Sequence, residues 1–197
     1  AHNGSVVPVP GRDIFVQAWY QGGLSVIDFS DTANPVEIAY FDRGPIHDER
    51  MVIGGYWSTY WYNGKIYGTE ILRGLDVMEL QVSEFLTENE LAAAKLSNMG
   101  NTFNPQQQFQ VTWPANPVVA LAYIDQLERD GGLAKSNIDA ARTLLNELQN
   151  VMSKGDKSAK LSILLVALAR DIKATKDDVN THKRITGLLD VLNDLSK

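Results

Sequence analysis

The sequence predicts an α+β protein with several domains, in which antiparallel β-propeller blades, forming an incomplete propeller, precede an α-helical bundle. Three observations predict this fold. Short β-branched and aromatic runs separated by turn residues fill residues 1–80. A phrase from this region recurs after 51 to 52 residues, and residues 133–197 contain three amphipathic segments.

The composition restricts the classes of function. Of the 197 residues 44% are hydrophobic, which is enough for a buried core, and the net charge of -6 argues against a nucleic-acid-binding protein. The chain has no cysteine, which excludes a disulfide framework, a thiolate metal site and a cysteine nucleophile. Its apolar runs are shorter than the roughly 18 residues of a spanning helix, so we expect no membrane span.

Residues 1–80 are predicted to form two propeller blades. The runs IFVQAWY, LSVIDFS and PVEIAYFD have strand composition, and QGG and SDTANP between them are turn signals. The pattern then recurs, because the segment GRDIFVQAWYQGGLSVIDF is matched by the later segment NGKIYGTEILRGLDVMEL. In this match Ile66 corresponds to Ile14, and the Gly-Leu pair at residues 74–75 corresponds to the pair at residues 23–24. Such a period, with about four strands per unit, is typical of a propeller blade.

The two predicted blades are too few to close a ring. The inner strand of the first blade is expected to be AHNGSVVPVPG, and that of the second blade GYWSTYWYNG. The second repeat ends after its third strand, at Leu80. We therefore expect the chain to be the C-terminal part of a longer protein. Its predicted partners are the remaining blades, from a precursor or a second chain; the alternative is self-association that covers the open strand edges.

The repeat phrase GLSVIDFSDTANPVEIAYF, with its second copy GLDVMEL, closely resembles the LVIVD-repeat family of secreted or surface-exposed bacterial β-propeller proteins. In that family a blade commonly opens with a His-Asn pair, here His2 and Asn3, and continues into a motif that matches residues 27–35. The resemblance covers residues 1 to about 80 and implies an extracellular or cell-surface location. It says little about catalysis, because most of the family has no assigned activity.

The second predicted blade departs from the family pattern. It has glycine, Gly54 or Gly55, where the first has His2. A ring of equivalent histidines around the propeller axis is therefore not supported.

Residues 81–132 are predicted to form a strap with short helices that packs on the propeller, like the extension after the last blade in many such proteins. QFQVTW, residues 108–113, has the composition of a strand or extended strap, and Trp113 is expected to dock it on the propeller. Helix starts and stops are predicted from capping residues here and further along the chain. These signals are Thr87 with Glu90, Asn116 before Pro117, Ser136 with Asp139, Thr175 with Asp178, and the stop Lys154-Gly155.

Residues 133–197 are predicted to form a three-helix bundle, because apolar residues recur every three or four positions and the connections are short. The predicted apolar faces are Ile138, Ala141, Leu145, Leu148 and Met152; Leu161, Leu164, Leu165, Leu168 and Ile172; and Ile185, Leu188, Leu189, Leu192 and Leu195. The spacing is similar to that of FIMAH-like helical modules appended to secreted bacterial proteins, which implies a role in assembly or attachment.

The densest polar cluster is DRGPIHDER, residues 42–50. His47, Asp48 and Glu49 are candidate ligands of a divalent ion such as calcium, zinc or manganese, because they offer nitrogen and oxygen donors. The alternative is a solvated loop between the blades. The sequence favours that alternative, since adjacent loop residues rarely all point at one ion.

A second candidate site lies at the predicted propeller axis, which inner strands face. His2 and Asn3 are candidate ligand-binding residues there, and Glu70 and Arg73 are candidates for lining the same opening. The alternatives are a histidine that is simply hydrogen-bonded in the channel wall and a structural Glu-Arg pair. The aromatics of YWSTYWYNG are either a carbohydrate-stacking platform or, by default, a layer that packs blades together.

The sequence favours a non-enzymatic, extracellular scaffold or protein–protein interaction module. No nucleophile elbow, HExxH, phosphate loop or dinucleotide motif occurs in it. One alternative is a metal-dependent propeller enzyme with an axial site that includes His2. The other is a subunit of a self-assembling surface fibre, in which an open blade edge pairs with the next subunit.

Overall fold

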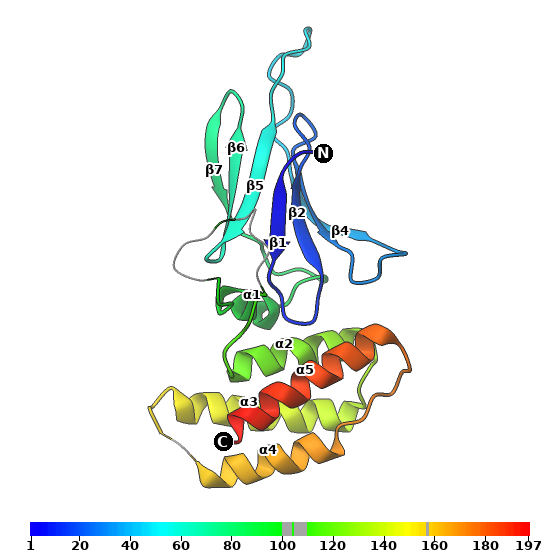
Figure 1. Cartoon of the computed structure of the whole chain (residues 1–197), viewed down its shortest axis with the longest axis vertical. Helices are drawn as coiled ribbons and strands as arrows, with labels where there is room; N and C mark the ends of the chain where they lie inside the picture. Colours follow the sequence, from blue (N-terminus) through cyan, green and yellow to red (C-terminus); the bar gives the residue numbers. More distant parts are fainter. Residues whose placement is uncertain (100–103, 105–109, 157) are drawn as a thin grey trace. The chain divides into compact units, whose positions relative to one another are not determined.

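The computed structural model divides the chain into two compact units, each considered by itself (Figure 1). It describes residues 1–99, 104, 110–156 and 158–197. The strand unit comprises Ala1–Leu86 and Met99–Val111, and the helical unit comprises Thr87–Asn98 and Thr112–Lys197. All described strands belong to the first and all described helices to the second, which confirms the α+β class.

The strand unit contains two antiparallel sheets, in which each strand pairs with the next along the chain. The four-stranded sheet is formed by β1 (Gly4–Val7), β2 (Ile14–Ala18), β3 (Leu24–Asp28) and β4 (Val36–Phe41). The three-stranded sheet is formed by β5 (Tyr56–Tyr62), β6 (Lys65–Glu70) and β7 (Gly74–Met78). Two successive meanders of short strands are therefore present, and the described strands do not close into a ring.

The sequence repeat corresponds to a repeated hairpin. Its end pairs are Ile14 with Asp28 and Ala18 with Leu24 in the first sheet, and Ile66 with Met78 and Glu70 with Gly74 in the second. Ile66 thus corresponds to Ile14, as predicted. The second turn is shorter, however, so Gly74 and not Leu75 pairs where Leu24 does, and Leu24 is buried whereas Leu75 is 60% exposed.

The two sheets meet along their first strands. β1 and β5 are joined by a parallel bridge between Asn3 and Ser58, and the Ser5 hydroxyl accepts a 2.7 Å hydrogen bond from the Trp61 amide. β5 contacts both β1 and β2. The largest buried apolar side chains of the strands are those of Ile14, Tyr56, Trp61 and Ile66. Alternation of buried and exposed residues along β2 and β6 leaves one face of each sheet for this core.

The helical unit contains five described helices around one apolar core. They are α1 (Glu88–Lys95), α2 (Pro117–Arg129), α3 (Lys135–Met152), α4 (Ala159–Asp171) and α5 (Val179–Leu195). The core includes α2, which contacts α1, α3 and α5, in addition to the three predicted helices. Nearly every residue of α2 is buried, as expected of a helix that is apolar on most sides.

Two of the four predicted helix starts are confirmed and two are wrong. Thr87 and Glu90 form the predicted capping box, and the Asn116 side chain caps α2. α3 instead begins after Ala134 without a side-chain cap, and α5 begins after Asp178, whose carboxylate accepts the Thr181 amide. The predicted stop is confirmed, since α3 ends at Met152 and Gly155 has a φ of 77°.

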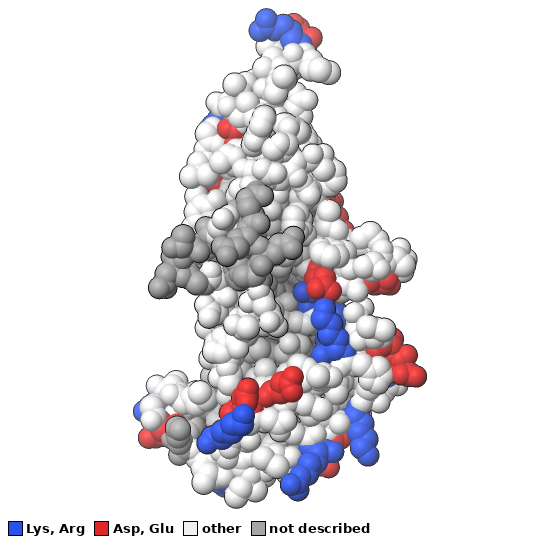
Figure 2. Space-filling model, in the orientation of Figure 1, with Lys and Arg blue, Asp and Glu red and all other residues white. Residues whose placement is uncertain are grey.

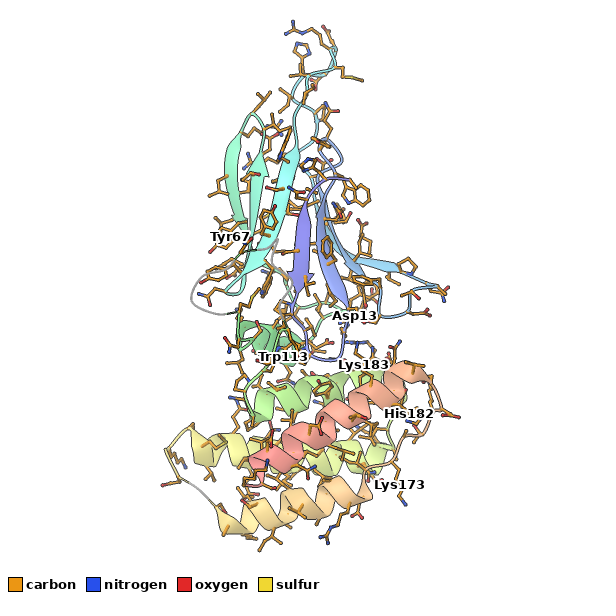
Figure 3. The ribbon with its side chains drawn as sticks, in the orientation of Figure 1. Asp13, Tyr67, Trp113, Lys173, His182 and Lys183 are labelled. Atoms are coloured by element: carbon orange, nitrogen blue, oxygen red, sulfur yellow. The ribbon has the colours of Figure 1, made fainter. Side chains whose placement is uncertain are left out.

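Two residues of the predicted apolar faces are largely exposed, namely Met152 (43%) and Leu164 (41%). Trp113 packs against the core of the helical unit, where Figure 3 labels it. Thr112 bridges Asn98 in the same unit. The predicted strap over residues 108–113 lies in part outside the described residues.

Candidate functional site

His2 lies in a small aromatic cluster of the strand unit. Its ring centroid is 4.7 Å from that of Trp57 and 5.3 Å from that of Tyr20, and the last two rings meet edge to face at 5.7 Å. The His2 Nδ1 atom is buried and has no hydrogen-bond partner within the part of the chain that the structure describes. The sequence-predicted axial histidine is therefore packed by aromatic rings, while the neighbouring Asn3 takes part in the bridge to β5.

The residues that correspond to His2 and Asn3 in the second repeat lie at the start of β5 and immediately before it. His2 and Asn3 exchange backbone hydrogen bonds with Ala18 at the end of β2. At the matching end of β6, Glu70 pairs with Tyr56 and not with Gly54 or Gly55. Asn3 lies opposite Ala18 in the first sheet as Tyr56 lies opposite Glu70 in the second, so Tyr56 corresponds to Asn3 and the preceding Gly55 corresponds to His2. This register agrees with the predicted glycine at the position of His2.

Glu70 fastens a turn. Its buried carboxylate accepts the Gly55 amide at 2.6 Å, the Leu72 amide at 2.8 Å and the Arg73 amide. Burial alone would raise the pKa of Glu70, but these three amides and the Arg73 charge outweigh it and hold the pKa below its usual value. A side chain at position 55 would put its Cβ 1.8 Å from the Tyr20 carbonyl oxygen, so the turn requires glycine.

The Arg73 side chain contacts the loop between the two sheets, which joins the end of β4 at Phe41 to the start of β5 at Tyr56. Its guanidinium donates to the carbonyl oxygens of Gly44 at 3.3 Å and Pro45 at 3.0 Å. The structure therefore brings Glu70 and Arg73 together through the Arg73 backbone amide, while the Arg73 guanidinium holds the loop.

A second set of contacts joins this loop to β7. Arg43 pairs with Asp76 at 2.7 Å, and the Tyr56 hydroxyl donates to the same carboxylate. Burial, together with this acidic acceptor, raises the pKa of Tyr56. Asp76 of β7 therefore binds both Arg43, which precedes the loop, and Tyr56 of the neighbouring β5.

The predicted metal-ligand triplet does not converge. His47 accepts the Glu49 backbone amide on Nδ1 at 3.0 Å, which turns the imidazole toward its own loop. Among the described residues, no three histidine or acidic side chains are arranged to hold a metal ion. His47, Asp48 and Glu49 thus lie next to one another along the chain without forming a ligand set.

A glutamine at position 70 is expected to reveal what the carboxylate contributes. Glu70→Gln should lower the free energy of unfolding at pH 7 by about 2 kcal/mol, because its NH₂ group would face the amides of Leu72 and Arg73. The folded pKa is lowered, so this contribution is present above the ordinary pKa of 4.5 and is lost as the pH falls through the folded value.

Urea unfolding of both proteins at several pH values measures this difference. The exposed Glu84→Gln is the matched control and should change little at any pH. A difference between Glu70→Gln and the unchanged chain that is as large at a pH below the folded pKa of Glu70 as it is at pH 7 would contradict the assignment.

The strand unit has a cavity that the sequence did not predict, called here the sheet cavity. Its volume is about 690 Å³ and it lies between the two sheets. One wall is formed by Leu24, Val26 and Ile38, and the other by Ile66 and Met78, while residues 79–83 and Phe85 complete the lining.

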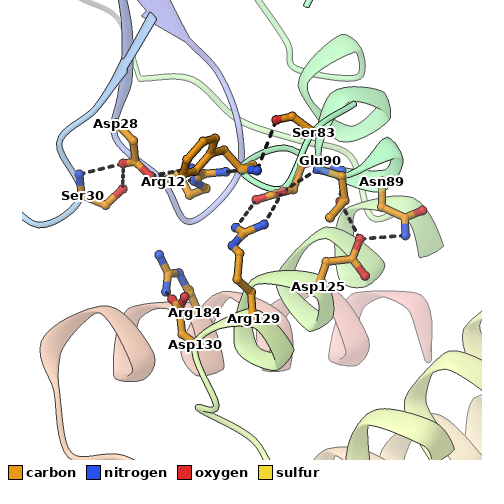
Figure 4. Close-up of polar contacts among 12 residues, drawn as sticks. Arg12, Asp28, Ser30, Ser83, Asn89, Glu90, Asp125, Arg129, Asp130 and Arg184 are labelled. Atoms are coloured by element: carbon orange, nitrogen blue, oxygen red, sulfur yellow. Dashed lines mark hydrogen bonds and ion pairs between the residues drawn. The ribbon is translucent and has the colours of Figure 1, made fainter. Parts of the chain in front are cut away.

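The segment that completes this lining is anchored to the first sheet. The buried Arg12 guanidinium donates to the Phe85 carbonyl oxygen at 2.6 Å and binds Asp28 (Figure 4). Burial raises the pKa of Asp28, but the Arg12 charge and two hydrogen bonds from Ser30 outweigh it and lower the pKa. Phe85, at the end of this segment, is therefore held beside the cavity by a hydrogen bond from an arginine that is itself ion-paired with Asp28.

A network of buried ion pairs and hydrogen bonds joins α1 to α2 in the helical unit. Arg129 binds the fully buried Glu90 carboxylate through two nitrogens at 2.9 and 3.0 Å (Figure 4). Asp125 accepts the Thr87 hydroxyl and the Asn89 amide. These contacts hold α1 on α2. In Figure 2, basic and acidic side chains alternate on the visible face of this unit.

Comparisons with models of protein families, with curated proteins and with solved structures gave no significant match. Every described helix is too short or too polar to cross a bilayer.

Proposed function

We propose that the strand unit is a pair of adjacent blades of an LVIVD-like propeller and serves as a non-enzymatic, extracellular scaffold or interaction module. The helical unit would then be an appended assembly or attachment module. The observation that carries the proposal is the bridge between Asn3 and Ser58, which sets β1 and β5 side by side and parallel, each at the start of an antiparallel meander.

This arrangement suits neighbouring blades of a ring. In a propeller the first strand of each blade lies near the axis, and successive blades pack face against face. The face of the second sheet that points away from the first sheet supports a further blade. Tyr67, Leu75 and Val77 share it, the last two being 60% and 55% exposed, and Figure 3 labels Tyr67 on the sheet.

Exposed apolar side chains on a sheet face indicate a partner surface. The partners that we propose are the remaining blades, from a precursor or from a second chain. The extracellular location follows from the family resemblance of the repeat phrase.

The intact mass of natively purified protein, with a search for co-purifying chains, tests this function. A larger polypeptide, or a tightly bound second fragment with similar repeats, is the expected result. A lone chain of 21.8 kDa that stays monomeric and stable would contradict the proposal, because no further blades would be present.

A further inference from the structure

We infer that α4 is a contact surface for a second copy of this chain, and that the two copies pack through their α4 helices in antiparallel orientation about a twofold axis. The inference rests on the proposed function, because it names the partner of the helical unit as an assembly module. The contact is made by the outward face of α4, called here the α4 stripe. This stripe consists of Lys160, Ile163, Leu164, Ala167 and Asp171.

The first observation is the position of α4 at the outside of the helical unit. α4 contacts α3 and α5, and Figure 1 shows it as the outermost helix of the unit. Its buried residues, Leu161, Leu165 and Leu168, share the face that packs on the core. The α4 stripe therefore lies on a side of the helix that points away from the core.

The second observation is that apolar side chains are exposed together on this helix. Ile163 is 70% exposed and Leu164 is 41% exposed, and the exposed Ala167 lies one turn further along. Grouped exposed apolar side chains indicate a partner surface. The other large apolar residues that are exposed in the described part of the helical unit lie singly at helix ends, namely Leu96, Met152 and Val179.

The third observation is the charge at each end of the stripe. Lys160 and Asp171 are both exposed and are separated by 11 residues, which is about 16.5 Å along a helix axis. Within the described chain neither side chain is in an ion pair. Both charges are therefore available to a partner.

This charge pattern fits a second copy in one orientation. In an antiparallel pair centred between residues 165 and 166, Lys160 of each copy lies opposite Asp171 of the other copy, and Leu164 lies opposite Ala167. A parallel pair would instead place like charges opposite one another. Opposite charges across an interface favour one register and disfavour the wrong one. The stripe is thus self-complementary, as a twofold contact requires.

The expected contact is weak. Leu164 against the small Ala167 allows the close approach of two packed helices, in which the axes lie about 8–10 Å apart. One helix from each copy buries less than the roughly 1,600 Å² of a standard interface, so we expect a dissociation constant of about 10 µM or more.

Sedimentation velocity of the full chain from about 1 to about 200 µM tests the contact. We expect the mass to rise from 21.8 kDa toward twice that value. Ile163→Glu should weaken association at least about tenfold, because it puts a charge into the contact. Met51→Glu is the matched control, because Met51 is 93% exposed in the strand unit, and it should leave association unchanged. Circular dichroism establishes that both variants fold.

A charge exchange tests the orientation. Lys160→Glu alone and Asp171→Lys alone each place like charges opposite one another, and each should weaken association about tenfold. Both substitutions in one chain should restore association. An equimolar mixture of the two single variants should also restore it, because every pair between the two different chains is again of opposite sign.

Three results would overturn the inference. They are a monomer at the highest concentration, association that is unchanged in Ile163→Glu, and no recovery in the mixture of charge variants. The proposed function is judged separately, by the mass of co-purifying polypeptides under denaturing conditions. A monomer found together with co-purifying blades would overturn only this inference. Association through α4 by a chain that purifies without further blades would contradict only the assignment of the strand unit.

Discussion

Trp61→Ala is expected to lower the free energy of unfolding of the strand unit by about 4 kcal/mol. The Trp61 side chain is 1% exposed and is the largest fully buried side chain of this unit. Its removal leaves a cavity in the core between the two sheets. Because the surrounding strands are hydrogen-bonded within their sheets, they can move only partly into that cavity. Urea unfolding followed by far-UV circular dichroism measures the loss.

Trp57→Ala is the matched control, because Trp57 lies in the same strand but is 49% exposed. We expect this second variant to cost about 1 kcal/mol or less. Trp61→Phe should cost less than the alanine change, because the phenyl ring leaves a smaller cavity. The indole nitrogen that it removes is buried without a hydrogen-bond partner in the described structure, so no hydrogen bond is lost. Equal losses for the two alanine variants would contradict the assignment of Trp61 as buried and Trp57 as half-exposed.

Arg129→Met is expected to destabilise the helical unit by about 3 kcal/mol. Glu90 is fully buried, and both of its carboxylate oxygens bind the Arg129 guanidinium. Removal of the arginine leaves a buried negative charge without its counter-charge, and such a change costs far more than loss of an exposed pair. The free energy of unfolding from urea titration is the measurement.

Lys135→Met is the control, because the Lys135 side chain is 70% exposed and its ion pairs lie at the surface. Its expected cost is below about 1 kcal/mol. The double variant Glu90→Gln with Arg129→Met should recover part of the loss, because the buried charge is then absent. A loss of under 1 kcal/mol for Arg129→Met alone would show that the pair does not hold α1 on α2.

Much of the fold could be predicted because it depends on local patterns. Alternating β-branched and aromatic residues mark the strands, and Thr87 with Glu90 and Asn116 mark helix starts that the structure contains. The hairpin repeat was visible because Ile14 and Ile66 occupy the same place in two similar pairings.

Features that depend on distant contacts could not be predicted. The helical core includes α2, which has no single apolar face because helices contact it on several sides. The α3 start at Ala134 has no side-chain cap and is set by the position of the preceding chain. Leu75 matched Leu24 in sequence, but the shorter turn in the second hairpin places it on the opposite, exposed face.

The candidate sites show the same limit. His2 was recognisable as a residue at the start of an inner strand, but its contacts with Tyr20 and Trp57 come from two other parts of the chain. Glu70 and Arg73 could be paired from the sequence because they are close along the chain. The Gly55 amide, which binds the Glu70 carboxylate from 15 residues away, could not be identified in this way. The sheet cavity has no local signal, because its walls belong to both sheets.

The parallel placement of β1 beside β5 is tested most directly by a disulfide between Asn3→Cys and Ser58→Cys. The chain has no cysteine, so no other thiol competes. Bridged residues in neighbouring strands lie within the distance that a disulfide spans, so thiol titration after mild oxidation should find both thiols consumed. The pair Val6→Cys with Ser58→Cys, displaced by three residues or about 10 Å, should keep its thiols. Two free thiols in the first variant under the same conditions would contradict the side-by-side repeats on which the proposed function rests.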